Sequence, residues 1–69
     1  MPRGFIIANG ERGEVELPCS IEQWLISHNL LPRSVVVEHN GHAVAPSEFG
    51  VRLVADGDRL EIVKIVAGG

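Results

Sequence analysis

The segment from residue 20 to residue 28 is the stretch of this chain whose apolar residues recur with the spacing of an α-helix. Ser20 stands where an N-cap is expected, and Gln23 follows three residues later, which completes a capping box. Asn29 suits the C-terminal end of such a helix. Four residues form the stripe that would pack on a sheet: Ile21, Trp24, Leu25 and His28. We therefore expect one amphipathic helix of about two turns.

β-branched and apolar runs on both sides of this helix predict strands. Before it, residues 5–8 and 14–17 are joined by a loop with two glycines, the pattern of a hairpin that Pro18 ends. After it come extended segments at 35–39, 42–45, 51–55 and 59–66, and a single helical turn at 47–49 with Phe49 as its core residue. Consecutive valines at 35–37 favour a central strand.

A chain of 69 residues forms a single domain, here taken as 1–69. A hairpin, one helix and further strands predict an α+β fold in which the helix lies across one face of a mixed sheet of about four or five strands. The other face would stay open. Alternation along the first and last strands assigns Phe5, Ile7, Val63 and Ile65 to a face opposite Ile6 and Ile62, but it does not decide which face the helix covers.

The net charge and the cysteine content limit the kinds of binding partner and the cellular compartment that we expect. The net charge is −3 and the six basic residues are scattered, which argues against nucleic acid. The single cysteine, Cys19, excludes an internal disulfide and suits a reducing compartment. There is no apolar run long enough to span a membrane and no signal peptide at the start. We expect a cytoplasmic protein.

Catalytic and metal-binding patterns are weak. His39 and His42 lack a firm third ligand and are interpreted as surface turn residues, with no metal bound. Asp56 and Asp58 are interpreted as turn formers. Cys19 has no histidine fixed beside it by the sequence, so an inert thiol is favoured. We expect this chain to be no enzyme and to bind no cofactor itself.

The last residues of the sequence combine an apolar strand with a tail of small residues, predicted to be flexible over 66–69. Without Cβ atoms, Gly68 and Gly69 could pass through a narrow channel and present a terminal carboxylate to a partner's active site. That carboxylate is the one group here with an obvious reactive role. A frayed chain end is the alternative.

Several motifs at fixed spacing resemble a known family: the strand and turn at 35–41, Val-Ala-Pro at 44–46, Asp-Gly-Asp at 56–58 and the ending at 61–69. Together they are similar to the ThiS sulfur carriers of thiamine biosynthesis, over essentially the whole chain. The resemblance implies a β-grasp, ubiquitin-like fold and a role as a protein-bound sulfur donor.

The resemblance also implies partners and a reaction. An adenylyltransferase related to ubiquitin-activating enzymes would use ATP and Mg²⁺ to join AMP to the carboxylate of Gly69. A persulfide sulfur, supplied by a cysteine desulfurase or another persulfide protein, would then replace AMP and leave a thiocarboxylate. Thiazole synthase would take that sulfur for the thiazole ring.

Under this interpretation Gly68 and Gly69 enter the partner's tunnel and Val66 and Ala67 line its entrance. The docking face would be centred on four apolar residues, Phe5, Ile7, Val63 and Ile65, which alternatively complete the core. Three other functions remain open: the small subunit of molybdopterin synthase, a ubiquitin-like modifier conjugated through Gly69, and a β-grasp interaction module with an incidental tail.

Overall fold

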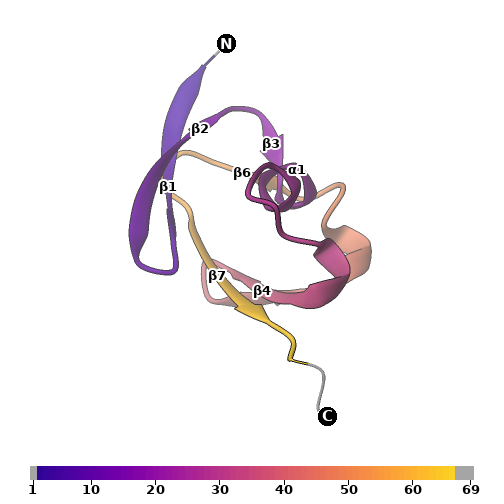
Figure 1. Ribbon diagram of the computed structural model, residues 1–69. Helices are drawn as coiled ribbons and strands as arrows, with labels where there is room; N and C mark the ends of the chain where they lie inside the picture. The colour runs from indigo at the N-terminus through magenta and orange to yellow at the C-terminus, as the bar shows by residue number, and fades with distance from the viewer. Residues whose placement is uncertain (1, 67–69) are drawn as a thin grey trace.

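The computed structural model describes residues 2–66, arranged as in Figure 1. A long hairpin comes first, then a helix, a second hairpin and a final strand that runs toward the C-terminus. The strands are β1 (Arg3–Ala8), β2 (Glu11–Glu16), β3 (Cys19–Ser20), β4 (Val35–His39), β5 (His42–Val44), β6 (Leu53–Val54) and β7 (Arg59–Lys64). The helical elements are α1 (Ile21–Ser27) and the 3-10 turns η1 (Pro32–Ser34) and η2 (Pro46–Glu48).

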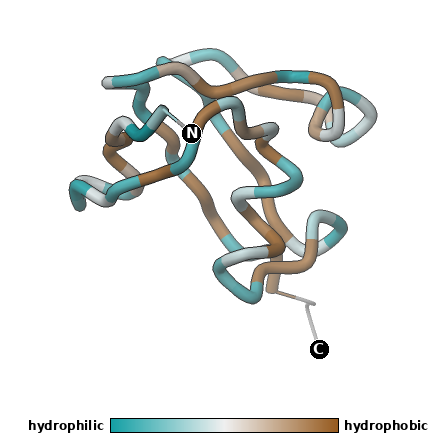
Figure 2. Tube along the Cα trace, turned by 90° about the horizontal axis from the view of Figure 1, so that it is seen from above, coloured by the Kyte–Doolittle hydropathy of each residue, from teal (hydrophilic) through white to brown (hydrophobic). Residues whose placement is uncertain are grey.

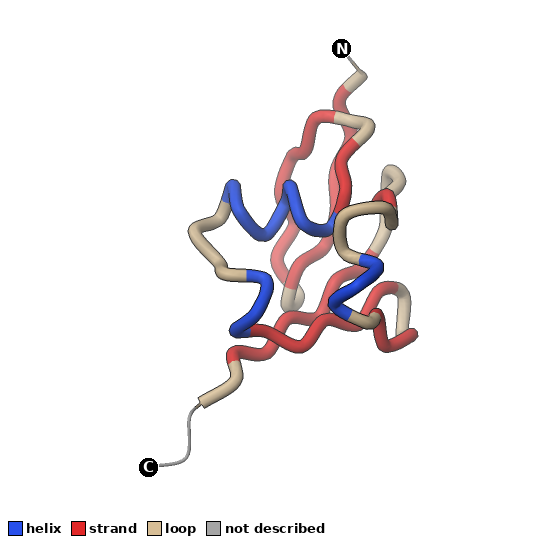
Figure 3. Tube along the Cα trace, turned by 90° about the vertical axis from the view of Figure 1, so that its right-hand side faces the viewer, coloured by secondary structure: helices blue, strands red, loops and turns tan. Residues whose placement is uncertain are grey.

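Five of the strands form one mixed sheet in the order β2-β1-β7-β4-β5. β1 and β7 run parallel, whereas the pairs β1–β2, β4–β7 and β4–β5 are antiparallel. The single α-helix of residues 2–66, α1, lies across one face of this sheet (Figures 1 and 3). The predicted α+β fold, a mixed sheet with one helix on one face, is therefore confirmed. Among the described residues, no helix is long and apolar enough to cross a bilayer.

The hairpin turn is shorter than expected. Asn9 and Gly10 have φ angles of 51° and 82°, the left-handed pair that a two-residue hairpin turn requires and that Asn-Gly supplies readily. Because the turn closes on these two residues, Glu11 pairs with Ala8 and Gly13 with Ile6. The prediction that residues 11–13 belong to the loop is wrong.

A second, two-stranded sheet was not expected from the sequence. β3 pairs antiparallel with β6, with Cys19 opposite Val54 and Ser20 opposite Leu53. The strand predicted over 51–55 is limited to this short β6. It fastens the segment before α1 to the chain that returns toward β7, so the N-terminal end of the helix is held in place.

The core lies between α1 and the sheet. The capping box is present, with Ser20 accepting from Gln23 and Gln23 accepting from Ser20. Ile21, Trp24 and Leu25 are buried, and Phe49 follows η2 into the same core. His28 was expected in the packing stripe but is the exposed C-cap residue, whose ring stacks on Trp24 at 4.0 Å between centroids.

The two faces of the sheet are clearly distinguished by burial. Ile6, Val35, Val37, Leu60 and Ile62 point to the helix and are at most 8% exposed. The alternate residues along the same strands point to the other face, which is covered by no helix of the described part of the chain. Sequence periodicity left the choice of face open; the structure decides it.

Candidate functional site

The end of β7 leads the chain out of the fold. Lys64 pairs with Val35 of β4, and the amide of Ile65 donates to the carbonyl oxygen of Ser34 at 2.8 Å. Val66 follows with 86% of its surface exposed. Figure 3 shows this segment projecting beside η1. Of the predicted tail residues, Val66 is thus placed outside the core, while Ala67, Gly68 and Gly69 lie outside the described residues.

The side chain of Asn9 holds the middle of β7 in place. Its Oδ1 accepts from the amide of Ile62 at 2.7 Å, and its Nδ2 donates to the carbonyl oxygen of the same residue at 3.1 Å. Asn9 thereby substitutes for one further residue of β1, because it satisfies both backbone groups of Ile62 beyond the end of that strand. The strand that precedes the tail is fixed from the hairpin side.

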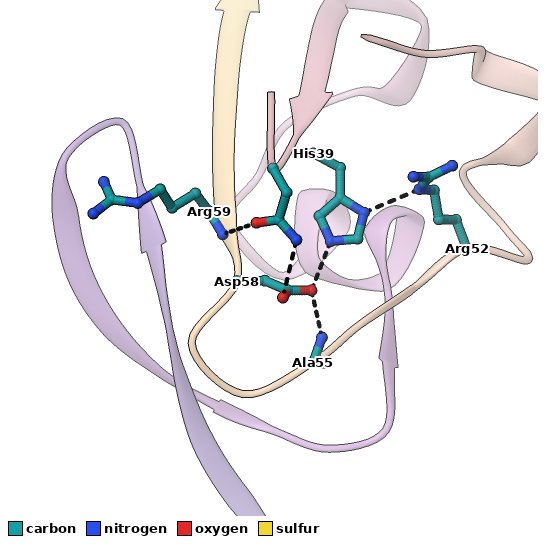
Figure 4. A network of polar contacts seen from close by, with 6 residues as sticks. His39, Arg52, Ala55, Asp58 and Arg59 are labelled. Atoms are coloured by element: carbon teal, nitrogen blue, oxygen red, sulfur yellow. Dashed lines mark hydrogen bonds and ion pairs between the residues drawn. The ribbon is translucent and has the colours of Figure 1, made fainter. Parts of the chain in front are cut away.

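Asp58 fixes the beginning of β7 (Figure 4). Its carboxylate accepts from Nε2 of His39 at 2.6 Å, from the amide of Ala55 at 2.7 Å and from Nδ2 of Asn40 at 3.1 Å. Nε of Arg52 donates to Nδ1 of His39 at 3.0 Å. Since Nδ1 accepts that bond, the ring proton is on Nε2 and is donated to Asp58.

The network has an electrostatic consequence. Partial burial is the largest influence on the Asp58 carboxyl and raises its pKa, but the hydrogen bonds from Ala55, His39 and Asn40 outweigh it. The pKa of Asp58 is therefore below its usual value. The interpretation of His39 as a surface turn residue is wrong, because it is 7% exposed and bonded to Asp58 and Arg52.

An apolar patch lies on the open face next to the tail. Val36 and Val63 are cross-strand neighbours, 52% and 64% exposed, and Ile65 beyond them is 56% exposed. Figure 2 shows the chain hydrophobic where β7 approaches the C-terminal end. Val63 and Ile65, predicted interface residues, are thus excluded from the core, and Val36 joins them. The run of three valines hinted at Val36 but gave no reason to place it on this face.

The other two predicted interface residues lie farther along the open face. Phe5 and Ile7 are half-buried on β1, and the Arg12 guanidinium sits 3.9 Å from the Phe5 ring centroid. Ile7 is level with Arg59 at the start of β7, whereas Val63 is near its end. The four predicted residues therefore share a face but form two separate groups. Whether they dock a partner stays a prediction.

The other reactive side chains among residues 2–66 form no further candidate site. Cys19 is buried, and burial raises the pKa of its thiol, which leaves it less nucleophilic. Within residues 2–66, no group of three or more His, Cys, Asp or Glu side chains is placed to hold a metal ion. What remains is a strand anchored at three points, an exposed apolar patch beside its end, and a tail leaving from that patch.

Solved structures with the same fold support this picture. A crystal structure of the thiamine biosynthesis protein ThiS from Geobacter metallireducens superposes with a TM-score of 0.80 at 25% identity, covering 94% of this chain and 99% of that one. A solution structure of a thiamine biosynthesis protein from the same organism gives a TM-score of 0.77 at 25% identity, with 94% and 87% covered. The fold is thus the predicted β-grasp.

Sequence comparison agrees. A thiazole synthase of Paramagnetospirillum magneticum is 34% identical over 64 residues, which are 93% of this chain but 20% of that protein. The chain thus spans about a fifth of the length of this curated relative. The model of the ThiS family matches residues 8–69. The chain belongs to the ThiS family.

Proposed function

We propose that this chain carries sulfur for thiazole formation in thiamine biosynthesis, as a thiocarboxylate on Gly69, and is itself no catalyst. Its family and its structural neighbours support the pathway. The thiazole synthase that contains a segment similar to this chain supports a thiazole synthase as the sulfur acceptor. The single cysteine suits the reducing cytoplasm, where we place the reaction.

The observation that carries the proposal is the way β7 ends. The strand is held as far as the bond from Ile65 to Ser34, then departs beside the exposed patch of Val36 and Val63. A partner that docks on this patch can receive the residues that follow at a fixed starting position. Small residues at 67–69 suit passage through a narrow channel, because they carry little or no side chain.

The chemistry divides between this chain and its partners. The Gly69 carboxylate attacks the α-phosphate of ATP in the activating enzyme, with Mg²⁺ bound there, and pyrophosphate leaves. The persulfide sulfur of a donor protein then displaces AMP from the acyl carbon, and a thiol cleaves the resulting disulfide to leave the thiocarboxylate. Activation is needed because an oxide is a poor leaving group, whereas AMP leaves readily.

The test is the intact mass of the chain after incubation with ATP, Mg²⁺, the activating enzyme and the sulfur source of its host. Replacing oxygen by sulfur adds about 16 Da, and oxidation of Met1 or Cys19 adds nearly the same mass. The measurement therefore uses a Cys19→Ser variant and fragments the protein to locate the gain. A gain confined to Gly69, absent without ATP, supports the proposal.

Other results would point elsewhere. No adenylate and no gain at Gly69 with a competent activating system would contradict the proposal. Amide-linked conjugates to lysines of other proteins would favour a ubiquitin-like modifier. A stable heterotetramer with a molybdopterin synthase large subunit, with no sulfur donated in the thiazole synthase reaction, would favour the small subunit of molybdopterin synthase.

A further inference from the structure

A second exposed apolar surface lies on the helix side of the tail's origin. Leu31 is 70% exposed and Ile26 is 58% exposed. Between them is a hollow of about 740 Å³ whose lining is Glu22, Ile26, Leu31, Pro32, Arg33 and Ser34. Nothing in the described fold covers these side chains. We call Ile26, Leu31, Pro32 and Arg33 the helix-side surface.

This surface is continuous with the origin of the tail. A smaller hollow of about 190 Å³ adjoins the first and shares Leu31 and Ser34 with it. Its far wall is formed by Lys64 and Ile65. The carbonyl oxygen of Ser34 accepts from the amide of Ile65, so the loop carrying Leu31 is bonded directly to the last anchored residue. The two apolar surfaces therefore meet at Ile65, one on each side of the sheet.

Two basic side chains and one acidic side chain, Glu22, line the hollows on the helix side. Arg33 and Lys64 line the hollows on the helix side, and neither is in an ion pair within residues 2–66. On the open face, Glu38 and Glu61 are cross-strand neighbours, next to Val36 and Val63. Like charges opposite each other are unfavourable in an isolated sheet. A partner complementary to Arg33 and Lys64 must bring an anionic group to the helix side, and one complementary to Glu38 and Glu61 must bring a cationic group to the open face.

We propose that the thiazole synthase contacts the origin of the tail on both sides, with an apolar side chain in the hollow beside Leu31 and an acidic group facing Arg33 and Lys64. This inference rests on the proposed function. Of the enzymes that function requires, the synthase is the one supported by the comparisons. An acidic group of the synthase opposite Arg33 and Lys64, with a basic group opposite Glu38 and Glu61, would favour one orientation of docking, so the tail enters the synthase in a single direction.

The experiment measures the affinity of the full chain for the thiazole synthase of its host by isothermal titration calorimetry. Leu31→Asp places a charge in the hollow at an exposed loop position, where Asp is well tolerated before a helical turn. Val51→Asp is the matched control, because Val51 is 79% exposed and lines neither hollow. We expect Leu31→Asp to weaken binding by about tenfold or more and Val51→Asp by less than about twofold.

A second variant guards against misfolding. Arg33→Glu reverses a charge on an exposed side chain and should weaken binding by several-fold, with a smaller loss at high salt. Urea unfolding of each variant shows whether the fold is retained. Equal affinities for Leu31→Asp, Arg33→Glu and the control would overturn the proposal.

Further outcomes distinguish a failure of this inference from a failure of the proposed function. If Leu31→Asp slows adenylation by the activating enzyme and leaves synthase affinity unchanged, the surface serves the activating enzyme and the proposal is wrong. Sulfur transfer by the wild-type thiocarboxylate, with no effect of Leu31→Asp, would refute the inference and leave the carrier function standing. Failure of the wild-type thiocarboxylate to donate sulfur would instead refute the carrier function.

Discussion

Asn9 and Ile62 are 53 residues apart in the chain, yet one side chain satisfies both backbone groups of the other residue. The bonds span 2.7 and 3.1 Å. Asn9 can make them because its left-handed backbone, φ 51°, turns the side chain toward β7 at the end of β1. The hairpin turn thus doubles as an anchor for the strand that precedes the tail.

Loss of this anchor should be measurable. Asn9→Gly keeps the left-handed backbone but removes both bonds, so the free energy of unfolding should fall by about 1 to 3 kcal/mol. Urea unfolding measures the loss, and hydrogen exchange at the Ile62 amide should become faster.

Asn29→Gly is the matched control, because Asn29 has a φ of 59° and no side-chain hydrogen bond among the described residues. The same substitution there reports the backbone effect of glycine alone. Equal destabilisation by the two variants would show that the bonds to Ile62 contribute nothing measurable.

Asp58 should make the free energy of unfolding depend on pH in the acidic range. Its pKa is lowered in the folded chain, so the unfolded chain binds the proton more readily. The stabilisation that the ionised Asp58 carboxylate contributes is therefore fully present at pH values well above its unfolded pKa of about 3.9. It is lost as the pH falls from about 5 through the pKa of the folded chain. Asp58→Asn lacks the titrating group and should flatten this part of the pH profile.

The comparison is made by urea unfolding between neutral pH and pH 3. At neutral pH, Asp58→Asn should be less stable than wild type by about 1 to 3 kcal/mol, because its NH2 group must face a donor, either Nδ2 of Asn40 or, with the amide turned, the donors of His39 and Ala55. The difference in the free energy of unfolding between wild type and Asp58→Asn should decrease as the pH falls. Glu16→Gln, at an exposed position, is the charge-matched control. A gap that stays constant with pH would contradict the role assigned to the carboxylate.

Local patterns predicted much of this fold. The capping box of Ser20 and Gln23 and the αL position of Asn29 depend on residues close in the sequence, and the structure contains both. The mixed sheet followed from the number and order of segments in a short chain. The reaction expected of the tail was inferred from the resemblance to the ThiS family, because hydrophobic periodicity carries no information about it.

The sequence did not predict the features that depend on residues far apart in the chain. His39 and Asp58 are 19 positions apart, and nothing local to either predicts that a turn carboxylate will meet a buried imidazole. The β3–β6 pairing likewise joins two-residue strands too short to show alternation. Val36 was not assigned to the interface because three consecutive valines give no period, and its face is set by the register with Val63.

The open-face patch should affect recognition and not folding. Val36→Thr combined with Val63→Thr keeps the shape and β-branching of both side chains but removes apolar surface where a partner would dock. Both residues are more than half exposed, so the free energy of unfolding should change by less than about 0.5 kcal/mol per site. Affinity for the thiazole synthase should fall by about tenfold. Val51→Thr, outside the patch and 79% exposed, should change neither quantity. If the double variant binds like this control, the synthase does not use the patch.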